Sequence, residues 1–285
     1  MQNYVHFRNI SRVYRHMSKN VTSTHMEKTI SKQREPVTAV GRIVQIAQLS
    51  KTVKEISIHV PNVEFKFKAG QWVDFMIPGV ETVGGFSMTS SPAKLEKHRI
   101  IDLAVKRSDH PPAHWVHSQC RVGDEVSLTV GGDFFYDPMT ENSKQLLFIA
   151  GGVGINPLYS IIQQIYQSLK SSNLDEDVKF ELLYSASDLH ELIFKDELDA
   201  IAEATGNFKC QMFVTRDKPA TNIVWGRKVK LERISAQVLE ETLRNFNTSA
   251  MTVFVCGPPS MIQFITSALK NAGVSNSNIK QEQWW

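Results

Sequence analysis

One stretch, residues 145–162, most constrains what this chain can fold into. It opens with the apolar run 146–150, which is typical of a buried parallel strand. The run ends in residues 151–154, whose three glycines allow the backbone to turn tightly and to lie close to a ligand. Asn156 is a favourable helix N-cap and Pro157 suits a first helical position, so a helix is expected directly after the glycines.

A strand, a glycine turn and a helix start together predict an anion site, because free N–H groups and the positive end of the helix dipole face the turn. The predicted ligand is a dinucleotide pyrophosphate; a plain turn is the alternative reading. The residues assigned to this ligand are Gly151, Gly152, Val153, Gly154, Ile155, Asn156 and Pro157. Pro157 stands where the usual fingerprint has a third glycine, which indicates a related but distinct nucleotide fold.

Charge is distributed unevenly along the 285 residues. Residues 1–35 hold seven Lys and Arg against two Asp and Glu, so the remaining residues carry 25 basic and 27 acidic side chains. A nucleic-acid-binding body is therefore not expected. No apolar run approaches the ~18 residues that cross a bilayer, so stable membrane insertion is not expected either.

Three cysteines, Cys120, Cys210 and Cys256, lie far apart with no C-x-x-C spacing. They cannot form a disulfide framework, a four-thiolate zinc site or an iron–sulfur cluster by themselves. We therefore expect a reducing compartment and no metal site.

Basic residues recur every three or four positions near the start, at Arg8, Arg12, Arg15 and Lys19, with apolar residues, serines and threonines between them. This pattern is typical of a mitochondrial transit peptide, whose basic amphipathic helix is attracted to anionic membranes. A disordered basic tail is the alternative. Residues 1–35 are accordingly set apart as a targeting segment or tail.

Residues 36–141 contain short β-rich runs separated by Gly, Pro and charged turns, which predict a six-stranded antiparallel barrel. The expected strands are 37–46, 53–60, 71–77, 85–88, 99–105 and 125–130. Residues 142–285 alternate strands with helices, which predicts a doubly wound parallel sheet. The expected strands there are 146–150, 179–184, 208–214 and 251–255, and the expected helices are 157–169, 189–204, 236–245 and 259–272. The predicted fold is thus a two-domain β plus α/β protein.

Several motifs occur in a recognisable order: A-G-Q-W-V-D-F (69–75), G-G-F-S-M-T-S-S-P (84–92), A-V-K (104–106), V-G-D-E-V (122–126), G-G-V-G-I-N-P (151–157) and C-G-P-P-S-M (256–261). With these motifs the chain resembles the ferredoxin–NADP reductase family, in which a flavin barrel precedes a pyridine-nucleotide domain. The resemblance covers nearly everything from residue 36 to the C-terminus. It implies FAD and a nicotinamide dinucleotide as cofactors.

By this resemblance, the family pattern R-x-Y-S falls on residues 84–87. Phe86 is expected to stack on the flavin ring, and Ser87 to supply a catalytic hydroxyl near flavin N5. Gly84 removes the arginine that binds phosphate in the family, at a cost of ~1.5–3 kcal/mol unless another group replaces it. The alternative is that Phe86 and Ser87 are ordinary barrel residues.

The candidates to replace the missing arginine are Lys106, Arg107 and His114. His114 belongs to the sequence P-P-A-H at residues 111–114, where the family has a G-x-x-S turn that opens a helix beneath the pyrophosphate. Prolines suit a first helical turn, so the helix start is expected to survive.

In the nucleotide domain, the resemblance places Cys256 beside the reactive nicotinamide carbon as a second catalytic residue, with Gly257 and Pro258 next to the cofactor. A buried cysteine at a strand end is the alternative. Asp188 is expected to accept from ribose hydroxyls and to repel a 2′-phosphate, which favours NAD over NADP. Trp285 is expected to shield the flavin; packing at the sheet edge is the alternative.

Together these features predict a flavin-dependent oxidoreductase that passes a hydride from NAD(P)H to a flavin and then electrons to a separate, unidentified acceptor. Orientation and the exclusion of water suffice for that transfer. The alternatives are a non-catalytic dinucleotide-binding protein with a degenerate flavin site and a subunit of a larger electron-transfer complex. The departures at Gly84, Phe86 and residues 111–114 support the non-catalytic alternative.

Deletion of residues 1–35 is expected to disperse a tagged protein from mitochondria into the cytosol while leaving the purified fold intact, because those residues are set apart as a targeting segment. Fluorescence microscopy of the tagged protein, with the full chain as control, measures the distribution. Unchanged mitochondrial localisation after the deletion would contradict the assignment.

Overall fold

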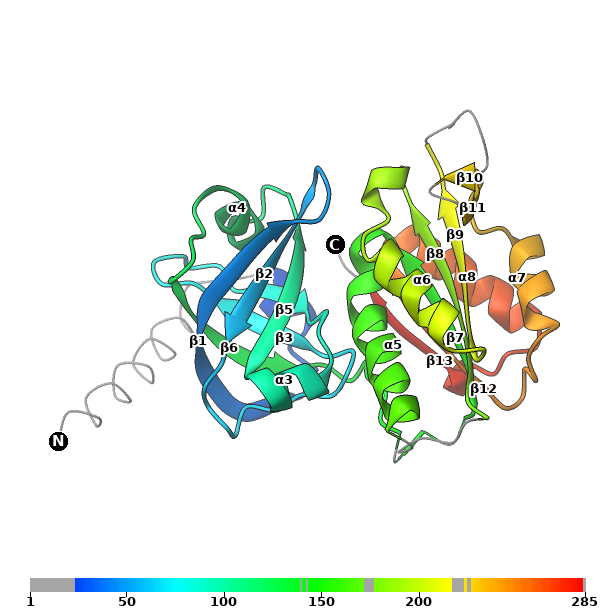
Figure 1. Cartoon of the computed structure of the whole chain (residues 1–285), viewed down its shortest axis with the longest axis horizontal. Coiled ribbons are helices and arrows are strands. Elements are labelled where there is room, and N and C mark those ends of the chain that lie inside the picture. Colours follow the sequence, from blue (N-terminus) through cyan, green and yellow to red (C-terminus); the bar gives the residue numbers. More distant parts are fainter. Residues whose placement is uncertain are drawn as a thin grey trace.

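The structure is a computed structural model and describes residues 24–138, 140–141, 143–171, 177–216, 223–224 and 227–283. Two domains lie side by side along the long axis of the molecule (Figure 1). The first is built almost entirely of strands, and the second is a sheet with helices on both faces.

Six antiparallel strands form the first domain, as predicted: β1 (Arg34–Gln48), β2 (Val53–His59), β3 (Trp72–Met76), β4 (Gly84–Ser87), β5 (Ile100–Lys106) and β6 (Glu125–Gly131). Their order in the sheet is β4-β3-β6-β1-β2-β5, and a bridge between Met88 and Leu103 links the two edges. The sheet is therefore nearly closed into a barrel. Its interior is filled by buried apolar side chains such as Ile43, Ile58 and Phe75. Two short helices, α3 (Pro92–His98) and α4 (Pro111–Ser118), connect strands of the barrel.

The second domain is a seven-stranded sheet with the order β10-β11-β9-β8-β7-β12-β13. Its strands are β7 (Gln145–Gly151), β8 (Lys179–Ala186), β9 (Phe208–Val214), β10 (Ile223–Val224), β11 (Arg227–Lys230), β12 (Met251–Gly257) and β13 (Ile279–Gln283). All pairs are parallel except the β10–β11 hairpin. Helices α5 (Ile155–Lys170) and α6 (Lys195–Ala204) cover one face, and α7 (Ala236–Leu243) and α8 (Pro259–Asn271) cover the other (Figure 1).

The doubly wound sheet is thus confirmed, with local differences. The sequence did not indicate β10, β11 or β13, which are short or polar and lack the apolar runs of buried strands. The predicted helix 189–204 is divided into a 3₁₀ turn, η2 (Leu189–Glu191), and α6. Phe194 adopts a left-handed conformation (φ 59°) between the two, so the backbone cannot continue as one helix.

The predicted domain boundary at residue 36 needs a correction, because residues 24–35 pack on the barrel. A short helix, α2 (Thr24–Lys28), lies against β3 and β4, and β1 already begins at Arg34. Asp74 on β3 is 1% exposed and accepts hydrogen bonds from Arg34 Nε (2.7 Å) and His25 Nε2 (2.8 Å). A buried carboxylate requires such partners, and the sequence supplies them from this segment. The expectation that a 1–35 deletion leaves the fold intact is therefore wrong for residues 24–35.

Helix α5 joins the two domains. Side chains along it donate to backbone carbonyls of the barrel: Asn156 Nδ2 to Ala104 (2.8 Å), Ser160 Oγ to Ser90 (2.6 Å) and Gln163 Nε2 to Thr89 (2.7 Å). One apolar cluster also runs from this helix into the barrel domain. These contacts fix the glycine turn that precedes α5 against the barrel.

Replacement of Asp74 by Asn is expected to lower the free energy of unfolding by ~3–5 kcal/mol, because a neutral amide leaves the Arg34 guanidinium without its buried counter-ion. Urea unfolding followed by circular dichroism measures the change. Asp133→Asn is the matched control, since the Lys32–Asp133 pair is exposed (41% and 67%) and a loss below ~1 kcal/mol is expected. Equal losses for the two variants would contradict the structural role of Asp74.

Candidate functional site

Two cavities meet at the glycine turn that follows β7. The inner one, of about 370 Å³, lies between the barrel and the carboxyl ends of β7 and β12. The outer one, of about 600 Å³, extends over the carboxyl ends of β7, β8 and β9. Both are lined by Lys106, Gly151, Gly152, Val153 and Pro258, so they form one continuous cleft. This is the edge at which doubly wound sheets bind ligands.

The turn itself is a 3₁₀ segment, η1 (Gly152–Gly154). Gly152 has a φ of +56°, and a Cβ placed there would meet nothing within 4 Å, so its backbone borders open space in the cleft. At Gly154 a Cβ would lie 2.2 Å from the carbonyl oxygen of Cys256, and the missing side chain lets the turn approach the end of β12 closely. Gly154 therefore packs the turn on β12, and Gly152 leaves the space above the turn clear for a ligand.

Most residues assigned to the pyrophosphate line this cleft, namely Gly151, Gly152, Val153, Gly154 and Asn156. Ile155 and Pro157 are buried within α5 instead. Because the 3₁₀ turn leads directly into the helix, α5 begins at Ile155, and Asn156 is not the N-cap that the sequence predicted.

Asn156 lines the inner cavity, and one of the two polar atoms of its side chain has no hydrogen-bond partner among the described residues. The residue is 5% exposed, and its Nδ2 donates to the Ala104 carbonyl oxygen. Its Oδ1 is buried and accepts no hydrogen bond from any described residue. Since an unsatisfied buried acceptor is costly, this atom calls for a donor that no described residue supplies.

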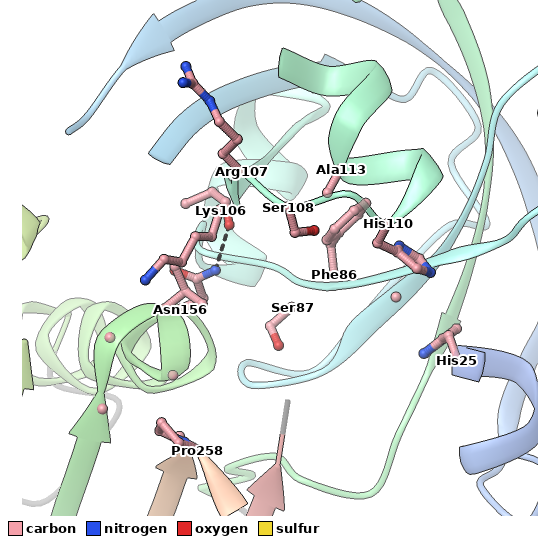
Figure 2. Close-up of a pocket in the computed structure, with 17 residues that line it drawn as sticks. His25, Phe86, Ser87, Lys106, Arg107, Ser108, His110, Ala113, Asn156 and Pro258 are labelled. Carbon is pink, nitrogen blue, oxygen red and sulfur yellow. Dashed lines mark hydrogen bonds between the residues drawn. The ribbon is translucent and has the colours of Figure 1, made fainter. Parts of the chain in front are cut away.

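On the barrel side, the predicted flavin residues Phe86, Ser87 and Lys106 line the inner cavity (Figure 2). Arg107 and His110 line it as well, and burial together with the neighbouring His25 and Lys28 lowers the pKa of His110. Figure 2 shows Phe86, Ser87 and His110 around the opening between the barrel and α5, whereas the Arg107 side chain points away from it.

His114 does not line the cavity, contrary to its assignment. The predicted helix start at Pro111 is present, and His110 is the N-cap of α4. His114 lies one turn further along on the exposed side, where its Nδ1 is 3.2 Å from Ser118 Oγ. The helix geometry thus turns His110 inward and His114 outward.

An acidic residue that the sequence did not single out, Glu282, neighbours both predicted catalytic residues. Ser87 Oγ lies 3.5 Å from Glu282 Oε2. Glu282, on β13, is the register partner of Cys256 on β12, and Cys256 is fully buried. Glu282 belongs to the C-terminal sequence Q-E-Q-W-W. The only feature of the sequence that could have indicated its role is its position close to Trp285, which was predicted to lie near the flavin. Trp285 lies outside the described residues.

Gly257 lines the inner cavity, and Pro258 lines both. Residues 185–187, from the loop predicted to bind the ribose, line the outer cavity. Asp188 is not among its lining residues, because Asp188 Oδ1 caps η2 by accepting from the backbone N–H groups of His190 (3.1 Å) and Glu191 (3.2 Å). Two cations that the sequence did not indicate, Arg216 and Arg233, line the cavity. They follow β9 and β11, which are neighbours in the sheet but distant in the sequence, so only the fold brings them to the same cavity.

Comparison with known proteins agrees with this architecture. A family model described as oxidoreductase NAD-binding domain matches residues 148–267. Oxidoreductase NAD-binding domain-containing protein 1 from Homo sapiens is 40% identical over 267 residues, covering 92% of this chain and 84% of that protein. Its Danio rerio counterpart is 39% identical over 273 residues, covering 94% and 100%. The chain belongs to the family of oxidoreductase NAD-binding domain-containing protein 1.

Solved structures share the fold. A ferredoxin NADP⁺ reductase from Neisseria gonorrhoeae, with bound FAD and NADP, has a TM-score of 0.69 at 20% identity, covering 88% of this chain and all (100%) of that chain. The FAD/NAD-binding domain of nitric oxide dioxygenase from Vibrio cholerae also has a TM-score of 0.69, at 20% identity, covering 86% and 98%. At these identities the likeness establishes the two-domain architecture.

Within the described ranges, no three His, Cys, Asp or Glu side chains gather in a way that would hold a metal ion. The same part of the chain contains no helix with the length and apolar character of a membrane span.

Replacement of Gly152 by Val is expected to weaken NADH binding by about 5- to 150-fold, because the side chain would enter the cleft and remove phosphate hydrogen bonds worth ~1–3 kcal/mol. Calorimetric titration with NADH measures the affinity. Gly273→Val is the matched control: Gly273 also has a positive φ (+87°) and open space around it, but it lies in neither cavity. Equal NADH affinity in wild type and a folded Gly152→Val variant would contradict the assignment of this turn.

Proposed function

We propose that the chain is an oxidoreductase that passes a hydride from NAD(P)H to a flavin and then electrons to a separate acceptor. The observation that carries the proposal is the continuous cleft, in which the residues assigned to flavin and those assigned to nicotinamide dinucleotide line adjoining cavities. The membership of the family and the FAD and NADP named for the Neisseria gonorrhoeae protein support both cofactors.

The inner cavity fits a flavin in its chemistry. Phe86 supplies an apolar ring, Ser87 a hydroxyl and Asn156 an acceptor without a partner among the described residues. Lys106 and Arg107 supply positive charge for a phosphate. These groups suit the ring and phosphate that FMN and FAD have in common, so they do not distinguish the two flavins.

When bound, a flavin supplies a hydride acceptor that can release electrons one or two at a time. The chain orients the reactants. The Gly152 turn binds the dinucleotide, and the contacts of α5 with the barrel hold the two cavities in a fixed position relative to each other. Glu282 accepts from Ser87 and so orients its hydroxyl, while the buried Cys256 shapes the end of β12. Holding reactants in a near-attack geometry and excluding water are sufficient for this step.

The preference for NAD(H) stays a prediction. It rested on a loop, residues 185–188, that has no basic residue. Arg216 and Arg233 bring to the same cavity the kind of charge that a 2′-phosphate needs, whereas Glu191 opposes it. The balance of these three side chains determines which nicotinamide is favoured.

The second candidate is a non-catalytic dinucleotide-binding protein. It is favoured by Gly84, where a Cβ would lie 2.8 Å from the Phe86 ring and 2.9 Å from Pro112, so that no arginine fits without rearrangement.

Mitochondrial targeting by the basic N-terminal region stays a proposal. Because residues 24–35 pack on the barrel, the proposed signal lies within residues 1–23 of the predicted segment 1–35, and these lie outside the described residues.

The purified protein is expected to carry flavin or to take up added FAD or FMN, and NADH should bleach the visible flavin band without oxygen. Absorption spectroscopy and anaerobic stopped-flow measure uptake and reduction, with NADPH as the alternative donor. Ser87→Ala and Cys256→Ala are expected to keep flavin content and NADH affinity but to slow reduction at least tenfold.

Ser118→Ala is the matched control, since this hydroxyl is exposed on α4 and, among the described residues, hydrogen-bonds to His114. A colourless protein that binds NADH but takes up no flavin would favour the non-catalytic candidate.

A further inference from the structure

We propose that a hydrogen bond between Thr52 and Glu191 positions one wall of the outer cavity, and that the binding of the nicotinamide dinucleotide depends on it. The wall is the loop of residues 187–194, which follows β8. The inference rests on the proposed function, because it takes the outer cavity as the dinucleotide site. Thr52 and Glu191 are positioning residues in this proposal, since they hold the wall in place and take no part in the transfer itself.

The bond links the two domains. Thr52 lies in the turn between β1 and β2 of the barrel, and its Oγ1 donates to Oε2 of Glu191, 139 positions away, at 2.5 Å. A hydroxyl that donates to a carboxylate at this distance forms a strong, charge-assisted hydrogen bond. Glu191 is only 9% exposed, so water competes poorly for its carboxylate. This contact is separate from those of α5, which reach the carbonyls of Ala104, Ser90 and Thr89.

On the barrel side, the turn that carries Thr52 is itself fixed. Ser50 Oγ accepts from the backbone N–H groups of Thr52 (3.2 Å) and Val53 (3.0 Å). The carbonyl oxygen of Thr52 accepts from the N–H of Arg107 (2.7 Å), which ties the turn to the end of β5. Val53 is 1% exposed and packs in the apolar cluster that joins α5 to the barrel. The Thr52 hydroxyl therefore has a defined position before any ligand binds.

On the side of the nucleotide domain, the loop after β8 is fixed around Glu191. Asp188 Oδ1 accepts from the N–H of Glu191 (3.2 Å), and Tyr184 Oη donates to the carbonyl oxygen of Glu191 (3.1 Å). Phe194 ends the loop in its left-handed conformation and stacks on Tyr159 of α5, with ring centroids 4.3 Å apart. Because the loop is fixed internally, a bond at Glu191 places it as a whole against the barrel.

The outer cavity lies where the two sides meet. Val53 and Lys106 line it from the barrel. Ser187 and Glu191 line it from the loop, so the bond holds together two parts of the wall that belong to different domains. A ligand that contacts both parts then binds without the entropic cost of bringing them together. Neither Thr52 nor Glu191 lines the inner cavity, so we expect the bond to affect the dinucleotide and not the flavin.

The test is a double-mutant cycle on the affinity for NADH, measured by calorimetric titration. Thr52→Val removes the hydroxyl at nearly constant shape and is expected to weaken NADH binding by about 3- to 30-fold, the scale of one hydrogen bond. In a Glu191→Ala background, the same substitution is expected to change the affinity by less than about twofold, since the partner is already absent. The cycle also cancels the direct effect of the Glu191 charge on the ligand's phosphates, which is the same with and without the Thr52 hydroxyl.

Two further variants separate positioning from a general loss of structure. Thr52→Ser keeps the hydroxyl and is expected to retain the NADH affinity within about twofold. Thr38→Val is the matched control, because Thr38 Oγ1 lies 2.8 Å from Thr129 Oγ1 within the barrel and lines neither cavity. All variants are expected to keep the flavin content of the wild type. At saturating NADH, Thr52→Val is expected to reduce the flavin at close to the wild-type rate, because a loss of uniform binding leaves the chemical step unchanged.

Four results would overturn the inference and leave the proposed function standing. They are an unchanged NADH affinity in a folded Thr52→Val protein, an equal loss with and without the Glu191 carboxylate, a Thr52→Ser loss as large as that of Thr52→Val, and a loss of flavin content as large as the loss of NADH affinity. A wild type that binds NADH but no flavin would favour the non-catalytic candidate, and the cycle on NADH affinity would still decide the inference. A wild type that does not bind NADH would refute the proposed function, on which the inference rests.

Discussion

The docking of α5 against the barrel is the interaction on which the site depends. The helix begins at the glycine turn that borders both cavities, and its next two turns donate through Asn156, Ser160 and Gln163 to barrel carbonyls. Because these carbonyls belong to β5 and to the segment after β4, the helix ties the glycine turn to the strands that line the inner cavity. The two cavities are therefore continuous as a consequence of a single helix placement.

A second constraint is the buried carboxylate of Asp74. Burying a charge inside a barrel wall is costly unless partners compensate for it, and both partners, His25 and Arg34, come from the segment before the barrel. This requirement draws α2 onto β3 and β4 and thereby sets an imidazole at the cavity wall. The histidine that satisfies Asp74 therefore also borders the inner cavity.

Much of the architecture follows from local patterns. The apolar run before Gly151, the glycines and the change from a β-rich to an alternating rhythm were enough to predict a barrel followed by a doubly wound sheet. Local signals failed where a residue's role depends on distant partners. Arg216 and Arg233 line the outer cavity, whereas Asp74 and Glu282 contact residues that line the inner one, His25 and Ser87. Nothing in the immediate sequence of these four residues indicates such partners. His114 was misplaced because a one-turn choice, His110 inward or His114 outward, depends on how α4 packs.

The sequence by itself determined the chemistry available at the glycine turn, because a strand, three glycines and a helix start specify their own backbone geometry within a few residues. It also determined what is missing, since Gly84 has no side chain to bind phosphate. Only the tertiary structure decided which groups surround the two cavities. Those contacts join residues up to 195 positions apart, as Ser87 and Glu282 are, and such pairs are set by packing and register rather than by local conformational preference.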